Sequence, residues 1–212
     1  MGIIVHNFFV FSILSEQVCP GYLFLIGVQF SEYSFGLYIA VLAFFHFSEF
    51  LVTGLTNPNN LSFDSYLVNH SVQYGIAAVA SWSEHALTLY LIPGIKDCRF
   101  ITLLGLAICI GGEILRKLAM FNAGQNFNHV VQDKRDEHHV LVTSGIYSFC
   151  RHPSYVGWFL WSVGSQILLI NPFCLVAYSV VSFHFFKERI TLEEYTLLSF
   201  FGNQYRLVSC FI

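Results

Sequence analysis

The segment FITLLGLAICIGGEILRKLAMF, residues 100–121, is apolar through its first half and long enough to cross a membrane as one helix. About 20 apolar residues in a helix span the hydrocarbon core of a bilayer. Two similar segments precede it, at 37–55 and 72–92. All three segments are therefore predicted to be transmembrane helices.

Two further apolar runs, 155–170 and 173–186, lie beyond a polar stretch that follows this segment. They are separated by the dipeptide Asn171-Pro172, and dipeptides of this kind mark turns. Because the separation is so short, the two runs are predicted to form a tight helical hairpin.

The composition of the chain indicates a membrane protein. Hydrophobic residues make up 55% of the sequence, charged residues only 11%, and the mean hydropathy is +0.61, whereas soluble domains carry about 25% charged residues. Two apolar stretches near the start, 3–14 and 20–31, are short, and are either truncated spans or a re-entrant hairpin. We therefore expect an all-α, polytopic integral membrane bundle of about seven spans, within a range of roughly six to eight.

Positively charged side chains are absent from the first 95 residues of the chain. None of the ten Lys and Arg residues occurs before Lys96. Because cytoplasmic loops carry an excess of Lys and Arg, residues 116–153 and the C-terminus are predicted to face the cytosol, with Lys96 and Arg99 on the opposite side. The net charge of −3, with no basic stripe interleaved with aromatic residues, argues against nucleic acid as a partner.

The chain divides into a plain front region, 1–121, with the N-terminal membrane-spanning helices, and a motif-dense region, 122–212. The second region comprises a cytosolic loop, the helical hairpin and a final helix. The loop is highly charged at 133–139 and is predicted to be extended at 140–147, where it ends in a Ser-Gly turn. Loops of roughly 25 residues in a compact chain are usually functional or disordered, and the apolar VLV triplet and Tyr147 favour an ordered one.

Five ionisable side chains lie inside the predicted spans of the front region: His46, Glu49, Glu84, His85 and Glu113. Such groups are costly in a membrane and often functional, but the interpretation we favour is an interhelical ion pair, of Glu49 or Glu113 with Arg116, that fixes packing.

A zinc site is not expected, because two helices that carry one His each provide no third ligand at a recognisable spacing. The six cysteines form no CxxC pair, so we expect neither a metal site nor a disulfide framework.

The most polar cluster beside an apolar run is Arg151, His152, Pro153, Ser154 and Tyr155. Proline suits the first turn of a helix, and that turn leaves backbone N–H groups free for an anionic group. The cluster therefore predicts a helix N-terminus that holds a polar ligand at the membrane surface. The alternative is that Arg151 extends to the interface and His152 caps the helix.

Arg189 and Glu193 are four residues apart and share one face of the last predicted helix. They form either an ordinary surface ion pair, worth a few tenths of a kcal/mol, or two separate ligand contacts. In the second interpretation the guanidinium binds a carboxylate and Glu193 reaches a cofactor.

Four blocks, in this order and spacing, resemble the isoprenylcysteine carboxyl methyltransferase family: FNHVVQ (127–132), HVLVTSGIY (139–147), RHPSYVGW (151–158) and FFKERITLEEY (185–195). The likeness also includes parts of the front region and covers about 35–206. It implies an S-adenosylmethionine-dependent enzyme of the endoplasmic reticulum membrane, with its active site facing the cytosol. The implied substrate is the C-terminal carboxylate of farnesyl- or geranylgeranyl-cysteine on processed CaaX proteins.

The resemblance also assigns roles to individual residues. Arg189 matches the arginine that holds the substrate carboxylate. The positions that match cofactor contacts are Gln132, His139, Val140, Leu141, Val142, Tyr147, His152, Pro153, Ser154, Tyr155 and Glu193. A cysteine carboxylate is already ionised at neutral pH, so its methylation needs no general base. The protein then has to bring the two reactants together in the correct orientation.

Three other functions remain open on the sequence alone. A phospholipid or other amine N-methyltransferase of the same architecture would need a base, for which Glu194 and His184 are candidates. A sterol reductase relative that uses NADPH would need more basic residues than the Lys134 and Arg135 of the loop. A membrane scaffold or carrier lined by the buried His and Glu would bind no cofactor.

Overall fold

The computed structural model describes residues 23–29, 34–67, 71–132, 134–135 and 139–207 of the 212-residue chain. All regular structure in these residues is helical, as predicted. Residues 23–29 are helical, and the remaining α-helices are α2 (Ser34–Thr56), α3 (Val72–Leu91), α4 (Arg99–Ala123), α5 (Pro153–Leu169), α6 (Pro172–Phe201) and α7 (Asn203–Arg206). Short 3-10 turns, η1 to η5, occupy Pro58–Asn60, Phe63–Tyr66, Pro93–Asp97, Gly124–Asn126 and Gly145–Ser148.

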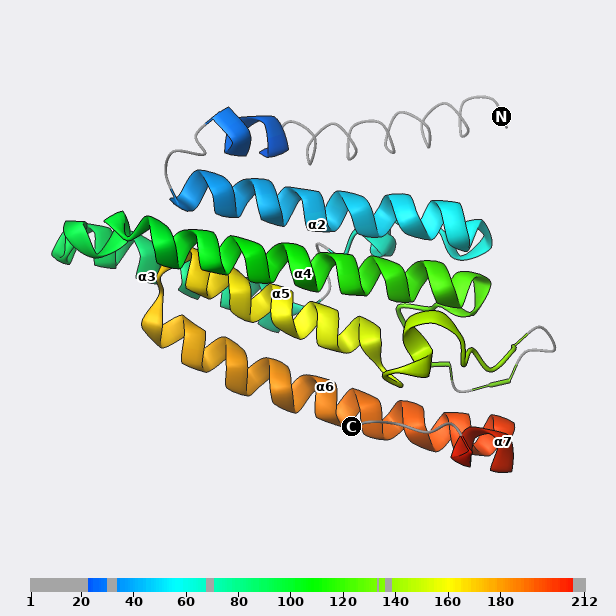
Figure 1. Ribbon diagram of the computed structural model, residues 1–212. Helices are drawn as coiled ribbons and strands as arrows, with labels where there is room; N and C mark the ends of the chain where they lie inside the picture. Colours follow the sequence, from blue (N-terminus) through cyan, green and yellow to red (C-terminus); the bar gives the residue numbers. More distant parts are fainter. Residues whose placement is uncertain (1–22, 30–33, 68–70, 133, 136–138, 208–212) are drawn as a thin grey trace, which may run out of the picture.

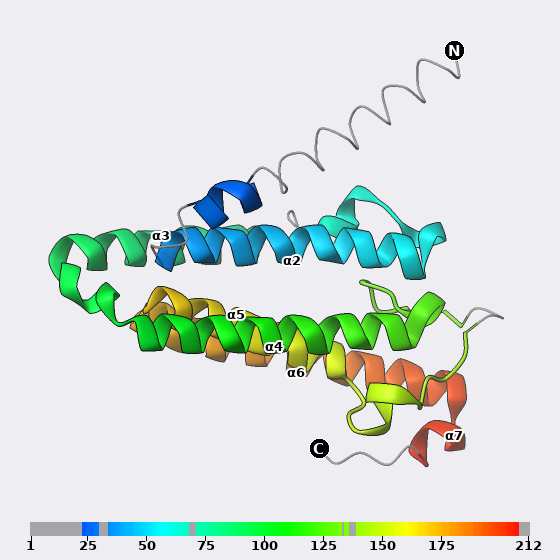
Figure 2. The same cartoon turned by 45° about the horizontal axis from the view of Figure 1, so that its top comes forward.

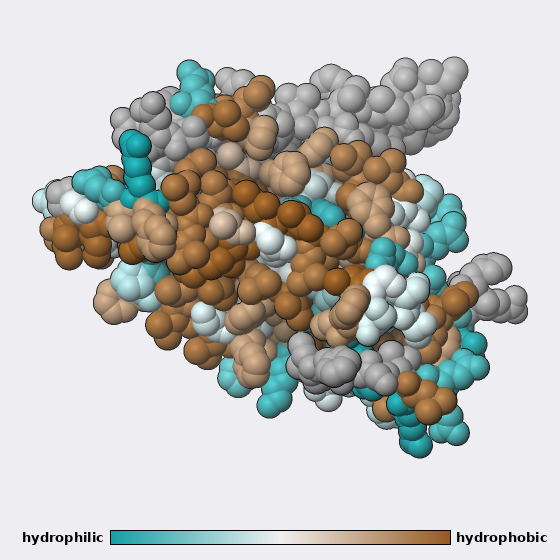
Figure 3. Space-filling model, viewed as in Figure 1, coloured by the Kyte–Doolittle hydropathy of each residue, from teal (hydrophilic) through white to brown (hydrophobic). Residues whose placement is uncertain are grey.

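Each of the five long helices contains one predicted span. By length and hydropathy, α2 alone among the described helices is apolar enough throughout to qualify as a membrane span. The expected total of seven and the expected orientation stay predictions, and the stretch 3–14 lies outside the described residues. Figure 3 shows a broad apolar surface over the middle of the bundle and polar residues towards its two ends.

The prediction of a separate final helix is wrong. The hairpin's second helix and the predicted final helix are one element, α6, which runs without a break from Pro172 to Phe201. The sequence from Lys187 to Glu194 contains no Gly or Pro, and its Lys, Glu, Arg and Leu are good helix formers. The helix ends at Gly202, which has a φ of 54°.

The long helices lie side by side along one common direction (Figures 1 and 2). The end of α2, the end of α4, the start of α5 and the end of α6 gather at one end of the bundle, with α7 and the described parts of the loop between α4 and α5. The α3–α4 connection and the α5–α6 turn lie at the opposite end. This arrangement brings the four family blocks together.

Helices α4 and α5 approach each other closely because both carry glycines at their interface. A Cβ on Gly112 would lie 2.5 Å from the carbonyl oxygen of Gly157, and one on Gly157 would lie 2.6 Å from the carbonyl oxygen of Gly112. Gly105 and Gly164, seven residues away on each helix, are similarly restricted. Small residues at such interfaces let membrane helices pack backbone to backbone.

The predicted turn at Asn171-Pro172 is confirmed, and two charged side chains that the sequence did not connect with it hold it. Ile170 adopts a left-handed conformation, with a φ of 55°, and ends α5. Lys96 Nζ donates to the carbonyls of Leu169 and Ile170 at 2.8 and 2.9 Å, and to Asn171 Oδ1 at 3.0 Å. A cation at a helix C-terminus stabilises the carbonyls that the helix leaves unpaired.

At the same turn, Glu84 of α3 receives the first amides of α6. Its two carboxylate oxygens accept hydrogen bonds from the N–H groups of Phe173 and Cys174, at 2.9 and 2.6 Å. A carboxylate at a helix N-terminus is favoured by the helix dipole. Glu84 is thus part of the scaffold, at the end of the bundle opposite the family blocks.

Candidate functional site

Two asparagines, one in the last turn of α4 and one in the following turn η4, hold the loop between α4 and α5. Asn122 Oδ1 accepts a hydrogen bond from the N–H of Ile146 at 2.8 Å, and Asn126 Oδ1 accepts one from the N–H of Val140 at 2.8 Å. Gly145 has a φ of 63°, and a Cβ there would lie 1.9 Å from Asn122 Oδ1, so this position requires glycine. The segment predicted to be extended over 140–147 has no regular secondary structure up to Ser144, and its end is instead part of the 3-10 turn Gly145–Ser148.

A cavity of about 80 Å³ lies between this loop, the end of α4, the start of α5 and the middle of α6. Six of the residues predicted for the site line it: Tyr147, His152, Ser154, Tyr155, Arg189 and Glu193. Arg151, which belongs to the cluster predicted to hold a polar ligand, lines it as well. Further lining residues, which the sequence did not single out for the site, are Arg116, Ala123, Asn126, Phe127, Asn128, His129 and Trp158. Residues far apart in the sequence therefore share one hollow.

The other predicted cofactor residues lie outside this cavity. Gln132 donates to the carbonyl of Val130, two residues before it, at 3.3 Å. Val140 is two-thirds exposed, and the ring of His139 lies 6.2 Å from that of Phe200. Leu141 and Val142 are partly exposed on the loop, and Pro153 is fully buried in the first turn of α5.

His152 connects the start of α5 to two adjacent carboxylates of α6. Its Nε2 lies 2.8 Å from Glu194 Oε1, and its Nδ1 lies 3.5 Å from Glu193 Oε2. Burial alone would lower the pKa of His152, but the two carboxylates raise it above its usual value. His152 occupies the N-cap position of α5, as the alternative expects, but its side chain makes no capping hydrogen bond.

Three side chains bind the carboxylate of Glu194. In addition to His152, it accepts from the Tyr205 hydroxyl at 2.6 Å and from Arg151 NH1 at 3.2 Å. Burial would raise the pKa of Glu194, but Tyr205, His152 and Arg151 lower it below its usual range. This carboxylate is therefore ionised, and α7 is fastened to the site through Tyr205.

Arg189 does not form the i,i+4 ion pair with Glu193; no such contact occurs within 4 Å in the described structure. Its Nε donates to the Tyr155 hydroxyl at 3.0 Å, and its NH2 donates to the carbonyl oxygen of His129. The guanidinium and the Glu193 carboxylate thus line the same cavity without forming the ordinary surface ion pair, and the two ligand contacts of the second interpretation stay a prediction.

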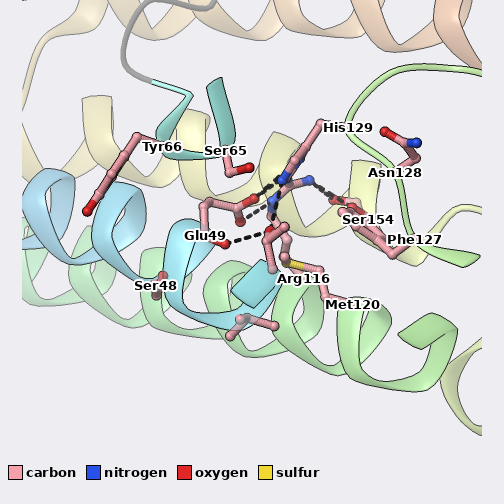
Figure 4. A network of polar contacts seen from close by, with 12 residues as sticks. Ser48, Glu49, Ser65, Tyr66, Arg116, Met120, Phe127, Asn128, His129 and Ser154 are labelled. Carbon is pink, nitrogen blue, oxygen red and sulfur yellow. Dashed lines mark hydrogen bonds and ion pairs between the residues drawn. The ribbon is translucent and has the colours of Figure 1, made fainter. Parts of the chain in front are cut away.

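A buried ionic network, drawn in Figure 4, reaches the cavity through Arg116, which is one of its lining residues. Glu49 of α2 accepts from Arg116 Nε at 2.6 Å and from Arg116 NH2 at 2.7 Å, and it also accepts from Lys117. The remaining nitrogen, Arg116 NH1, donates to Ser154 Oγ at 2.7 Å. The favoured interpretation of Glu49 and Arg116 is confirmed: the pair joins α2, α4 and α5.

His129 packs directly on this network. Its Nδ1 lies 3.8 Å from Glu49 Oε2, and its Nε2 lies 3.1 Å from Thr53 Oγ1. Burial lowers the pKa of His129 to about 4; Glu49 opposes this shift, and the cations Arg116, Lys117 and Arg189 add to it. The imidazole is therefore neutral at physiological pH.

Comparison with known proteins shows to which family the chain belongs. The model of the isoprenylcysteine carboxyl methyltransferase (ICMT) family matches residues 103–199. A protein-S-isoprenylcysteine O-methyltransferase of Tribolium castaneum is 48% identical over 206 residues, which cover 94% of this chain and 73% of the relative. The chain belongs to the isoprenylcysteine carboxyl methyltransferase family. The human protein-S-isoprenylcysteine O-methyltransferase is 49% identical over 181 residues, 84% of this chain and 64% of the relative.

A solved structure, described as the eukaryotic intramembrane Ras methyltransferase ICMT, superimposes with a TM-score of 0.86 at 49% identity. It covers 88% of this chain and 69% of its own chain. As a member of the isoprenylcysteine carboxyl methyltransferases, the chain is an enzyme that methylates the carboxyl group of a prenylated cysteine. The family separates it from the amine methyltransferases, sterol reductases and carriers considered as alternatives.

In this methyltransferase the cavity-lining residues that sequence reasoning missed include Arg116, His129 and Trp158. His129 lies in the FNHVVQ block, beside the Gln132 that was chosen instead. The polar side chains between Asn122 and Asn128, directly before His129, were the feature of the sequence that could have indicated its role. Trp158 gave no signal of its own, yet its ring lies 4.6 Å from the Arg116 guanidinium carbon.

Proposed function

We propose that this methyltransferase takes its methyl group from S-adenosylmethionine and acts at the cytosolic face of the endoplasmic reticulum membrane. Its substrates are then processed CaaX proteins that end in farnesyl- or geranylgeranyl-cysteine. The observation that supports this proposal best is the shared cavity, in which Tyr147, His152, Tyr155, Arg189 and Glu193 meet at one end of the bundle. Carboxylate and guanidinium in one hollow suit a cationic donor and an anionic acceptor.

The residues present fit the proposed methyl donor. Oε2 of Glu193 is buried, and its neighbour His152 Nδ1, at 3.5 Å, does not complete a hydrogen bond. Within the described part of the chain this carboxylate oxygen accepts no hydrogen bond. A carboxylate with an unsatisfied oxygen favours a cationic ligand, which can share Glu193 with His152. The aromatic rings of Tyr147, Tyr155 and Trp158 line the same cavity, and aromatic faces attract cations.

The cavity is smaller than a ligand of this size needs, because drug-sized ligands occupy pockets of about 300–1,000 Å³. The predicted contacts Gln132, His139, Val140, Leu141 and Val142 lie on the adjoining loop, outside the cavity. We therefore assign to them the part of the donor that the cavity does not hold. Pro153 supports the site by starting α5 beneath His152 and Ser154.

Arg189 is proposed to hold the acceptor carboxylate. Two of its nitrogens are bonded to Tyr155 and His129, and NH1 makes no hydrogen bond to any residue that the structure describes. When bound, S-adenosylmethionine supplies a methyl group carried on a sulfonium. The protein does not have to remove a proton from the acceptor, because the acceptor carboxylate is already ionised. Arg189 then orients the acceptor, and the buried surroundings exclude water.

The lipid part of the substrate is proposed to enter from the bilayer, between helices. A groove of about 290 Å³ between α5 and α6 is lined by Phe159, Ser179, Val180, Phe183 and His184. It is mainly apolar, as a hydrocarbon chain requires. His184 lies in this groove and not in the cavity, so it is not placed to serve as the base that an amine substrate would need.

The test combines binding and turnover on the purified protein in detergent. Titration with S-adenosylmethionine is expected to saturate one site, and a farnesyl-cysteine analogue is expected to be methylated. Arg189→Ala should abolish turnover and leave donor binding within about twofold. Lys187→Ala, two residues away and exposed, is the matched control and should behave as the wild type. Full turnover by Arg189→Ala would disprove the role of this residue, and failure to bind the donor would disprove the proposed cofactor.

A further inference from the structure

The direction in which Arg189 presents its free nitrogen depends on two protein contacts. Its Nε donates to Tyr155 of α5, and its NH2 donates to the backbone carbonyl of His129 in the loop. A guanidinium is planar and rigid, so fixing Nε and NH2 also fixes where NH1 points. Whatever holds the carbonyl of His129 therefore helps to aim Arg189.

The imidazole of His129 is held by Thr53 of α2. The Thr53 hydroxyl donates its only hydrogen to the carbonyl of Glu49, at 2.8 Å. Thr53 Oγ1 can then only accept from His129 Nε2, 3.1 Å away. The hydrogen count thus assigns the tautomer: His129 carries its hydrogen on Nε2 and donates it to Thr53.

The Thr53–His129 contact lies beside a buried ion pair. Figure 4 shows the imidazole of His129 against the carboxylate of Glu49 and the guanidinium of Arg116. The Glu49–Arg116 pair is fully buried and bidentate, and such pairs hold a specific geometry. On its outer side His129 meets the ring of Phe127 edge to face, at a centroid distance of 5.4 Å.

We propose that Thr53 and His129 are positioning residues of this methyltransferase: by fixing the loop carbonyl that binds Arg189, they aim the guanidinium at the acceptor carboxylate. Neither residue has been given a role in the reaction by the family blocks. The inference rests on the proposed role of Arg189. Helix α2 supplies none of the cavity's lining residues, and the proposal gives it a defined effect on the reaction.

Three substitutions on one face of α2 isolate the contact. Thr53→Val keeps the shape and removes the acceptor for His129. Thr53→Ser keeps the hydroxyl. Thr56→Val is the matched control, because the Thr56 hydroxyl also donates to the carbonyl four residues before it, at 2.8 Å, and makes no contact with His129.

With a farnesyl-cysteine analogue as the varied substrate, Thr53→Val should lower kcat/KM about tenfold, mainly through KM. A tenfold change corresponds to about 1.4 kcal/mol, the order expected when a buried donor loses its acceptor. The Kd for S-adenosylmethionine should stay within about twofold. Thr53→Ser and Thr56→Val should keep the wild-type kcat/KM within about twofold.

Equal kcat/KM values for Thr53→Val and Thr56→Val would overturn the proposal, as would a parallel loss of donor binding, which indicates a merely structural role. If Thr53→Val yields too little folded protein, His129→Asn tests the contact from the loop side. It should raise KM for the prenylcysteine in the same way, and an unchanged KM would also overturn the proposal. These outcomes are separate from those of Arg189→Ala, which tests the role of Arg189 itself.

Discussion

Replacing Gly112 with alanine tests whether the close contact of α4 and α5 holds the site together. The new Cβ would lie 2.5 Å from the carbonyl oxygen of Gly157 and 2.7 Å from the backbone nitrogen of Trp161, whereas ordinary contacts begin at 3.4 Å. Both neighbours are backbone atoms, so the clash cannot be relieved by a side-chain rotation. The two helices would have to separate by nearly one ångström.

A gap of this size removes a quarter to a half of the dispersion energy of each contact along the interface. Overpacking of this kind costs about 1–3 kcal/mol. Gly111 provides the matched control, because a Cβ there meets nothing within 4 Å and alanine favours a helix over glycine. Both variants belong to the same turn of α4, so helix propensity affects them equally.

The assay is thermal unfolding of the purified protein in detergent, followed by titration with S-adenosylmethionine. Gly112→Ala should unfold several degrees below the wild type and bind the donor more weakly, because Arg116, one turn later, meets Ser154 across the same interface. Gly111→Ala should be as stable as the wild type or slightly more stable. Equal melting temperatures for the two variants would refute the packing argument.

Three further predictions concern the network and the loop. Glu49→Gln should destabilise the fold by about 3–5 kcal/mol, because it leaves Arg116 charged and buried without its partner; a melting temperature within 2 °C of the wild type would contradict this. The charged form of His152 is stabilised by two carboxylates, which raise its pKa, so this stabilisation is complete below about pH 6.5 and is lost as the pH rises through the raised pKa. The difference in melting temperature between the wild type and His152→Gln should accordingly shrink from pH 6.5 to pH 9, and a constant difference would count against the assignment. Gly145→Ala, which places a Cβ 1.9 Å from Asn122 Oδ1, should displace the loop and weaken donor binding about tenfold, as measured by titration; unchanged affinity would show that the loop does not contribute.

The helices could be predicted from the sequence because their causes are local. Apolar length located the five long helices, Asn171-Pro172 located the turn between two of them, and Pro153 located the start of α5. The one large error, the separation of α6 into two helices, arose because the hydropathy falls after 186 while helix propensity does not. A change from apolar to charged residues marks the membrane surface and not the end of a helix.

The site could be predicted only where its residues lie within the family blocks. Tyr155, Arg189 and Glu193 meet in the cavity as expected. His129 and Thr53 are 76 residues apart, and no local pattern shows that the loop folds onto α2. The same is true of Lys96 and Glu84, whose partners at the α5–α6 turn depend on how the helices pack. Contacts of this kind follow from the tertiary arrangement.

The central claim is that one cavity holds both reactants at the same end of the bundle. An experimental structure of the protein with S-adenosylhomocysteine and farnesyl-cysteine tests it most directly. We expect the amino acid part of the first ligand beside Glu193, and the carboxylate of the second within hydrogen-bond distance of Arg189. A prenylcysteine carboxylate bound elsewhere, with Arg189 still bonded only to Tyr155 and His129, would contradict the account.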